Sequence, residues 1–183
     1  FLLVNTIRAS ARAIARQIRA GGFIPLSAEC RFGPGEAFPP LPLITADGQE
    51  ASLMGVIDRI DTADIDDARY YRVVDYKTGG RKLDFGEVLD GLALQLPLYL
   101  AAAAKAGNGR AGLYYMTLSA PLPTESADMA AAATEAFRLK GLTLQDPRVV
   151  LANDFSLASG KGLLEGVSPD GESFKGDLCT AEQ

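Results

Sequence analysis

Cysteine is scarce in this sequence and histidine is absent. The two cysteines, Cys30 and Cys179, lie far apart, and neither belongs to a C-x-x-C pair. This usage excludes a disulfide framework and a zinc site built on paired cysteines. We expect two reduced thiols, although the sequence leaves a single disulfide between them open.

Long apolar runs are also missing. No stretch of about 18 apolar residues occurs, so we expect no membrane-spanning helix. The first residues lack the basic, apolar and small-residue order of a secretory signal, and a cytoplasmic location is the default expectation. The sequence starts at Phe1 rather than at methionine, which suggests a piece of a larger protein.

Positive charge is in deficit, since the formal net charge is -5. This is unfavourable for a nucleic-acid enzyme, because phosphate affinity comes largely from lysine and arginine. Residues 1–40, however, hold five arginines against two glutamates. An acidic body with one basic edge fits a domain that takes most of its DNA grip from a partner.

The chain of 183 residues, 48% of them hydrophobic, suits one globular domain over residues 1–183. Periodicity and turn residues predict an α/β or α+β domain with one mixed sheet flanked by helices. Helices are expected over residues 5–20, 85–104 and 126–139. Strands are expected over residues 24–32, 41–45, 51–60, 70–76 and 112–118, followed by a weak hairpin of 162–167 and 173–175. We interpret residues 61–68 as a polar, acidic link.

The first helix is expected to be amphipathic. Its predicted core positions recur at helical spacing: Ile7, Ala11, Ile14 and Ile18. Beside them runs a basic stripe: Arg8, Arg12, Arg16 and Arg19. This stripe is either a solvated face or an edge that meets DNA or a partner.

The strand that ends in D-Y-K carries the main chemical signal. Side chains alternate across a strand, so Asp75 and Lys77 share one face, about 7 Å apart along the chain. Val74 and Tyr76 point to the other face. The residues Thr-Gly-Gly follow directly and end the strand. An acid and an amine at a strand end are therefore candidate catalytic groups.

A second carboxylate, Asp58, follows an apolar run in the preceding strand. If the two strands form an antiparallel hairpin, Asp58 lies beside Asp75. Two such carboxylates, with the backbone carbonyl of Tyr76 as a third ligand, suit Mg²⁺, with Mn²⁺ as an alternative. Such a metal activates a bound water and neutralises charge on a phosphate, and Lys77 orients or deprotonates that water.

A lone D-x-K is a weak signal, because an Asp–Lys pair on a surface strand is common. The signal gains weight from a downstream helix on which Gln95 and Tyr99 stand at i and i+4. Either residue alone would be a surface or boundary position. Both together point at one place.

The run GVIDRID…YYRVVDYKTGGRKLDFGEVLDGLALQLPLYL, residues 55–100, resembles the RecB-like branch of the PD-(D/E)XK nucleases. It is most similar to the C-terminal nuclease domain of AddB/RexB-type subunits of bacterial ATP-dependent helicase/deoxyribonucleases. Upstream GFIPLSAECRFG and downstream LKGLTLQDPRVV share the likeness. The ordered pattern I-D-R, D-Y-K and Q-x-x-x-Y is specific.

The resemblance implies a restriction-endonuclease-like core with its catalytic residues at one sheet edge. By position, Asp58 and Asp75 would bind the metal, Lys77 would assist the attacking water, and Gln95 and Tyr99 would lie near the DNA. Members of the family degrade one strand of an unwound, broken duplex during recombinational repair. They work with a helicase–nuclease partner subunit of the AddA/RexA type.

Two departures from the family are visible. Its members usually carry a metal-site histidine on a helix before the first strand, and this chain has no histidine. The full-length family also holds an iron–sulfur cluster on four cysteines. Cys30 and Cys179 match neither part of that spacing, so we expect no cluster in this chain.

Other readings of the sequence are less favoured. The acidic residues of 61–68 lack the glycine and terminal glutamate of a calcium loop, and Ser159-Gly160-Lys161 lacks the rest of a phosphate loop. Glu29 is more simply a surface strand carboxylate. The competing functions are a non-catalytic nuclease-fold module that binds DNA or acts as a scaffold, and a stand-alone RecB-like exonuclease.

Overall fold

The computed structural model of the protein describes residues 2–104, 109–118, 135–160 and 162–180. Its centre is a mixed sheet built, in chain order, from β1 (Ile24–Phe32), β4 (Gly55–Ile65), β5 (Ala68–Lys77), β6 (Gly109–Thr117), β7 (Leu139–Leu144) and β10 (Leu178–Cys179). Their spatial order is β1-β4-β5-β6-β7-β10. The β5/β6 and β7/β10 pairs are parallel, and the other neighbours are antiparallel.

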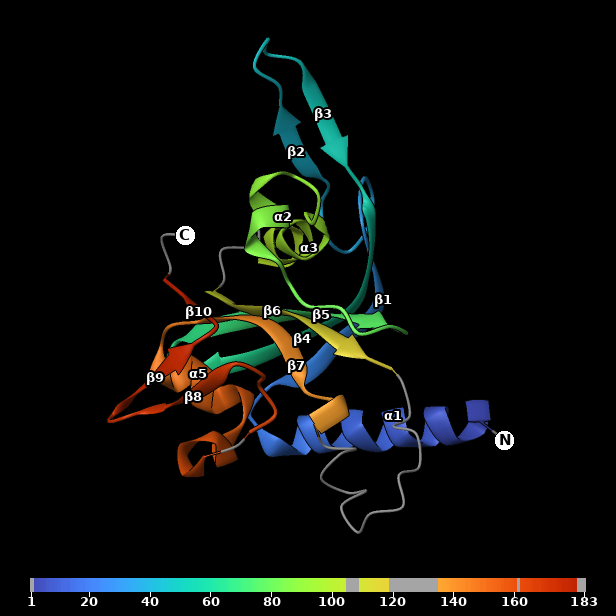
Figure 1. Cartoon of the computed structure of the whole chain (residues 1–183). Coiled ribbons are helices and arrows are strands. Elements are labelled where there is room, and N and C mark those ends of the chain that lie inside the picture. Colours follow the sequence, from blue (N-terminus) through green and yellow to red (C-terminus); the bar gives the residue numbers. More distant parts are fainter. Residues whose placement is uncertain (1, 105–108, 119–134, 161, 181–183) are drawn as a thin grey trace.

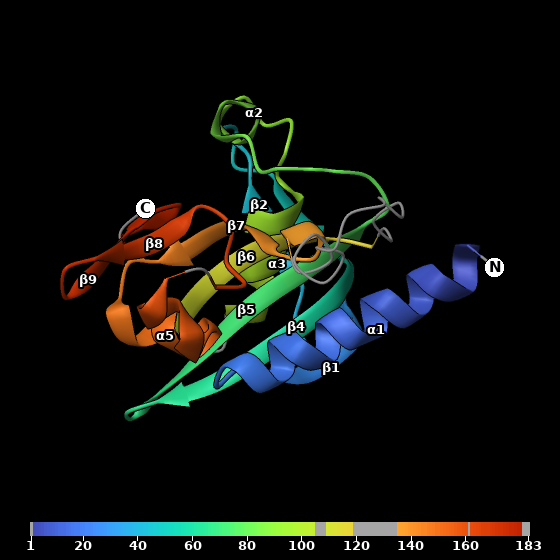
Figure 2. The same cartoon turned by 60° about the horizontal axis from the view of Figure 1, so that its bottom comes forward.

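Helices cover both faces of the sheet (Figures 1 and 2). One face carries β2 (Leu41–Ile44), β3 (Glu50–Leu53), α2 (Phe85–Leu89) and α3 (Gln95–Ala103). The opposite face carries α1 (Leu2–Ala20), α5 (Pro147–Asn153), the 3-10 helix η2 (Phe155–Ser159), β8 (Val167–Asp170) and β9 (Ser173–Gly176). A mixed α/β fold with helices on both sides of one sheet confirms the predicted fold class.

Two apolar layers hold the helices to the sheet. Alternation along β5 sends Val73 into the layer under α3, where it joins Leu96 and Leu100. The next residue, Val74, enters the opposite layer with Met116 and Val150. Residues 71–75 of β5 are all buried, because both faces of this strand are covered, and two of the five are charged. Those two charges lie on opposite faces: Asp75 belongs to the candidate site and Arg72 to a buried polar network.

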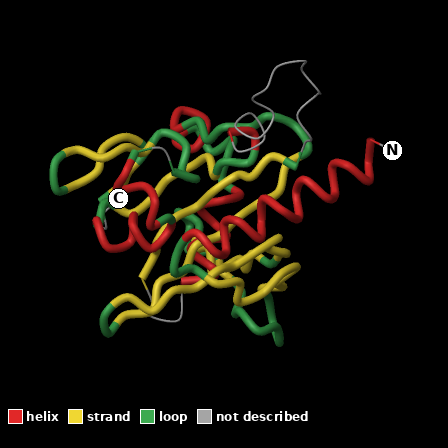
Figure 3. Tube along the Cα trace, turned by 90° about the horizontal axis from the view of Figure 1, so that it is seen from below, coloured by secondary structure: helices red, strands yellow, loops and turns green. Residues whose placement is uncertain are grey.

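The inward face of α1 differs from the prediction. Ile7 is 58% exposed and Ala11 is exposed, whereas Ser10 and Gln17 are buried. Small residues at Ala9 and Ala13 pack against the sheet, and the helix runs close along this face (Figure 3). Of the four predicted core positions, Ile14 packs there and Ile18 is partly buried. Gln17 can be buried because polar groups in the interior form hydrogen bonds with its side chain.

Three predicted elements have other boundaries. The helix over residues 85–104 is interrupted: α2 ends at Leu89, Gly91 takes a left-handed φ of 75°, and α3 begins at Gln95. The strand over residues 51–60 is two strands, parted at Met54. The supposed acidic link over residues 61–68 is mostly strand, because β4 continues to Ile65 and only a tight turn joins it to β5.

The C-terminal third also departs from the prediction. Residues 126–134 of the third predicted helix lie outside the described part, and its last position, Leu139, begins β7. The expected hairpin exists but is shifted, since β8 starts at Val167 and pairs with β9. No helix in the described ranges is long and apolar enough to cross a membrane.

Candidate active site

Asp75 and Lys77 lie at the carboxyl end of β5, on the face that packs against α3. Lys77 Nζ is 2.6 Å from Asp75 Oδ2, so the ammonium forms a close ion pair with this buried carboxylate. Burial raises the pKa of Asp75, the Lys77 ammonium lowers it, and the nearby Asp58 carboxylate raises it again. The balance is a raised pKa, typical of a carboxylate that a cation would stabilise.

Asp58 comes from the neighbouring strand β4, two residues before Ile60, which packs in the core layer under α3. Ile57 and Ile60 enter one core layer although they stand three residues apart, so the strand does not alternate regularly here. Across β1, the residue facing this point, Glu29, has a left-handed φ of 50°. The β1/β4 register is nevertheless continuous at this point, and its shift lies earlier, between Pro25 and Ser27. Asp58 Oδ2 accepts a hydrogen bond of 2.8 Å from the backbone N–H of Tyr76.

The helix residues Gln95 and Tyr99 join this cluster from α3. Lys77 Nζ donates to Gln95 Oε1 at 3.1 Å, and Gln95 Nε2 donates to the Tyr99 hydroxyl at 3.0 Å. The Tyr99 ring also packs edge-on against Phe32, with 6.1 Å between ring centroids. Because Gln95 and Tyr99 stand at i and i+4 on α3, the Tyr99 hydroxyl holds Gln95, and Gln95 holds the ammonium of Lys77. This chain of two hydrogen bonds forms a relay from α3 to the site.

Two residues near the site were missed by the sequence reasoning. Tyr115 lies beside Asp75 in the β5/β6 register and is buried, with Lys77 Nζ 5.5 Å from its ring centroid. The guanidinium of Arg81 lies over the same ring, at 5.7 Å. The sequence signal for either residue was weak: Arg81 follows the glycine pair that ends β5, in a loop whose path no periodicity predicts.

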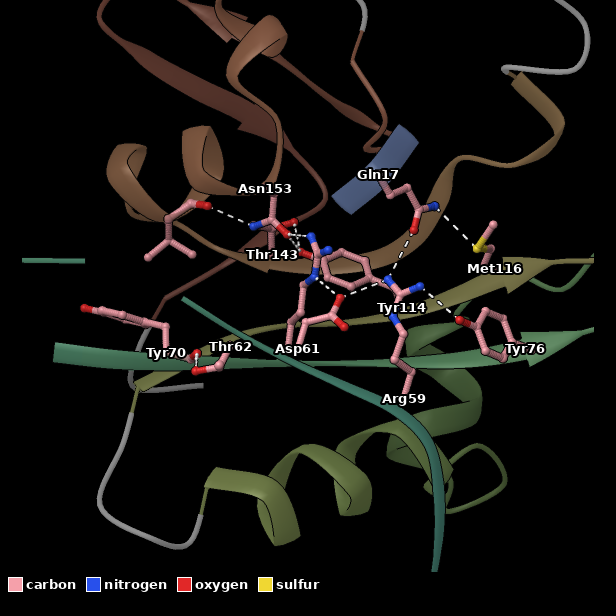
Figure 4. A network of polar contacts seen from close by, with 12 residues as sticks. Gln17, Arg59, Asp61, Thr62, Tyr70, Tyr76, Tyr114, Met116, Thr143 and Asn153 are labelled. Carbon is pink, nitrogen blue, oxygen red and sulfur yellow. Dashed lines mark hydrogen bonds and ion pairs between the residues drawn. The ribbon is translucent and has the colours of Figure 1, made fainter. Parts of the chain in front are cut away.

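A buried polar network lies on the opposite face of the same strands (Figure 4). Asp61 Oδ2 accepts from Arg59 Nη2 at 2.9 Å and from Arg72 Nε at 2.8 Å, and all three residues are at most 3% exposed. Arg59 Nη2 also donates to Gln17 Oε1 of α1, and Arg72 Nη1 donates to Asn153 Oδ1 of α5. The network therefore ties both helices of this face to β4 and β5.

Tyr76 connects this network to the candidate site. Its hydroxyl accepts from Arg59 Nη1 at 2.9 Å on one face of the sheet, while its backbone N–H binds Asp58 toward the other. Arg59 also lies 5.8 Å from the centroid of the Tyr76 ring. The backbone at Tyr76, which supplies the predicted carbonyl ligand, is thus held from both sides.

The donor set suits a hard divalent cation. Among the described residues there is no group of three or more His, Cys, Asp or Glu side chains that could hold a metal ion. Asp58 and Asp75 instead offer two carboxylates, and burial raises the pKa of the Asp75 carboxyl. Mg²⁺ commonly takes one or two carboxylates and keeps several waters, so these residues fit it.

Comparison with known proteins places the chain in a family. Residues 3–159 match the model of the PD-(D/E)XK nuclease superfamily. Three relatives are named as subunits of an ATP-dependent helicase/deoxyribonuclease: those of Desulforudis audaxviator (37% identical over 92% of this chain), Moorella thermoacetica (35% over 95%) and Clostridioides difficile (30% over 97%). The chain spans 16% of the length of each. The match and the mixed sheet confirm the predicted resemblance, and the chain belongs to the PD-(D/E)XK nuclease superfamily.

Proposed function

We propose that this chain is a metal-dependent deoxyribonuclease domain that acts as an exonuclease on a DNA strand unwound during recombinational repair of double-strand breaks. The observation that carries the proposal is the meeting of Asp58, Asp75 and Lys77 at one end of β5. Two acids with an amine beside them match the requirements of metal-assisted phosphodiester hydrolysis.

Each residue has a separate task in the proposed reaction. Asp58, Asp75 and the Tyr76 carbonyl would hold the cation, which when bound would lower the pKa of a water molecule and neutralise charge on the phosphate. Lys77, held by Gln95, orients the attacking water through the N–H groups of its ammonium. Its ammonium also lies where negative charge develops on the phosphate.

The wider context of the reaction rests on the relatives. They are named as subunits of an ATP-dependent helicase/deoxyribonuclease. We therefore propose a helicase–nuclease subunit of the AddA/RexA type as the partner that unwinds the duplex and delivers single-stranded DNA. The net charge of -5 agrees with a domain that relies on a partner for much of its DNA affinity.

The proposal is tested with end-labelled linear DNA and with circular single-stranded DNA. We expect Mg²⁺-dependent loss of the linear single strand, full inhibition by EDTA, and resistance of the circle. Cleavage that persists in EDTA would contradict a metal-dependent reaction. Rapid cutting of the circle would identify an endonuclease instead. DNA binding without cleavage in either Mg²⁺ or Mn²⁺ would favour the scaffold alternative.

The relay from α3 gives a graded prediction. Gln95→Ala removes the acceptor that fixes the Lys77 ammonium, a hydrogen bond of about 1.5 kcal/mol. We expect kcat to fall about tenfold, because one such bond corresponds to that factor. Tyr99→Phe removes only the hydroxyl that holds Gln95, so its effect should be smaller.

Steady-state cleavage of a linear single strand separates two roles for this pair. A fall in kcat at constant KM indicates that Gln95 positions Lys77. A rise in KM at constant kcat would instead mean that Gln95 and Tyr99 act through direct contact with DNA, as their position in the family motif suggests. Wild-type values for both variants would exclude either role.

A further inference from the structure

Arg81 is an exposed arginine whose guanidinium lies over the Tyr115 ring at the candidate site, and its charge lowers the pKa of Asp75. It stands in the loop between β5 and α2, four residues beyond Lys77. Its guanidinium and the Lys77 ammonium are 5.7 Å and 5.5 Å from the centroid of one buried ring, that of Tyr115. Tyr115 is the register neighbour of Asp75. Two cations and a carboxylate thus gather around one aromatic ring.

The donors of Arg81 are not used within the part of the chain that the structure describes. Its side chain forms no ion pair or hydrogen bond there, although a guanidinium carries five N–H donors. The next residue, Lys82, differs, because its ammonium pairs with Glu165, 2.9 Å from Oε1. Consecutive basic residues of one loop therefore have different surroundings, and only the first faces the site.

A count of charges shows what Arg81 adds. The two carboxylates, Asp58 and Asp75, balance the two cations, Lys77 and Arg81, so the four groups together are neutral. With a divalent cation the site would carry two positive charges, and without Arg81 it would carry one. Phosphodiester hydrolysis adds a second negative charge to the phosphate as the transition state forms. The site would then match that charge only with Arg81 present.

We propose that Arg81 is a phosphate-binding residue of this site, which holds a non-bridging oxygen of the DNA backbone at or next to the bond that is cut. The planar guanidinium suits this task because it offers paired donors to phosphate oxygens. This inference rests on the proposed function and adds a DNA-binding residue to it. The competing role is that of a local counter-charge for Asp75, which requires no contact with DNA.

The test compares Arg81→Ala with Lys82→Ala, a control that removes the same charge from the same loop. Binding of a single-stranded oligonucleotide is measured at several salt concentrations with Ca²⁺ in place of Mg²⁺. Loss of one phosphate contact on a single strand lowers the slope of log K against log salt by about 0.7. We expect this loss in Arg81→Ala and not in Lys82→Ala, whereas Arg81→Lys should restore the slope.

Cleavage with Mg²⁺ provides the second readout. Arg81→Ala should lower kcat about a hundredfold, the small end of the range for removal of one transition-state donor. Arg81→Lys should recover only part of this, because a lysine cannot form paired hydrogen bonds. Unchanged slope and unchanged kcat in Arg81→Ala would overturn the proposal, as would equal slope losses in Arg81→Ala and Lys82→Ala.

The two readouts keep this inference separate from the proposed function. If the wild-type protein cleaves and Arg81→Ala behaves like it, the nuclease assignment stands and the role of Arg81 is wrong. If the wild-type protein does not cleave with any divalent cation, the nuclease assignment fails. The salt slope then still decides, by its loss or retention in Arg81→Ala, whether Arg81 contacts phosphate.

Discussion

Asp75→Asn is expected to lower Mg²⁺-dependent DNA cleavage by about a thousandfold while leaving the protein folded. The amide keeps the volume of the side chain but carries no negative charge for the cation. Loss of about 4 kcal/mol of electrostatic stabilisation of the transition state corresponds to that factor. The fold should tolerate the change, because burial and Asp58 already disfavour the charged form of Asp75. The measurements are strand degradation and a thermal unfolding curve.

Lys77→Ala is the matched variant that separates metal binding from catalysis. It should also stop cleavage, by about 10²-fold to 10³-fold, because its ammonium acts on the water and the phosphate. Mn²⁺ binding, followed by calorimetry, should persist in Lys77→Ala and be weakened in Asp75→Asn. Wild-type cleavage by Asp75→Asn would contradict the site. Lost metal binding in a folded Lys77→Ala protein would show that the two roles are misassigned.

The largest effect on stability is expected at Asp61, on the other face of the sheet. One oxygen of Asp61 accepts from both Arg59 and Arg72, and the three side chains are buried. Asp61→Ala would leave two buried guanidinium groups without a counter-charge. Removal of one partner from a buried ion pair costs about 3–5 kcal/mol, so we expect a loss of at least that size.

Urea denaturation measures this effect, with Asp64→Ala as the control. Asp64 lies on the same strand and also binds an arginine, Arg69, but this pair is exposed to solvent. Its loss should leave the denaturation midpoint almost unchanged. Equal midpoints for Asp61→Ala and Asp64→Ala would contradict the expectation and would mean that water reaches Arg59 and Arg72 when Asp61 is removed.

Asp61 also shows where sequence reasoning failed. Its neighbours are polar, so residues 61–68 resembled a solvated link. In the tertiary structure Asp61 is buried instead. It binds Arg72 from β5, and the arginines of this network also bind Gln17 from α1 and Asn153 from α5. No local pattern reveals that these distant polar groups satisfy one another. The buried face of α1 was predicted wrongly for the same reason, because Gln17 is buried where it joins this network.

The candidate site was predictable to the extent that it depends on local geometry. Alternation along one strand places Asp75 and Lys77 on one face whatever the rest of the chain does. The i, i+4 spacing likewise directs Gln95 and Tyr99 to one side of their helix. The helix itself was predicted too long, because the left-handed turn at Gly91 competes with a helical periodicity that runs through it.

The sequence by itself thus determined the mixed α/β class, the strand end that carries the acid and the amine, and the helix pair beside it. These follow from fixed repeats of about 2 and 3.6 residues, which need no knowledge of distant contacts. Only the tertiary structure decided how Asp58 is aimed, that Arg81 folds back over Tyr115, and that Asp61 is buried. Those outcomes depend on which separate elements meet and on how each buried charge finds a partner when they do.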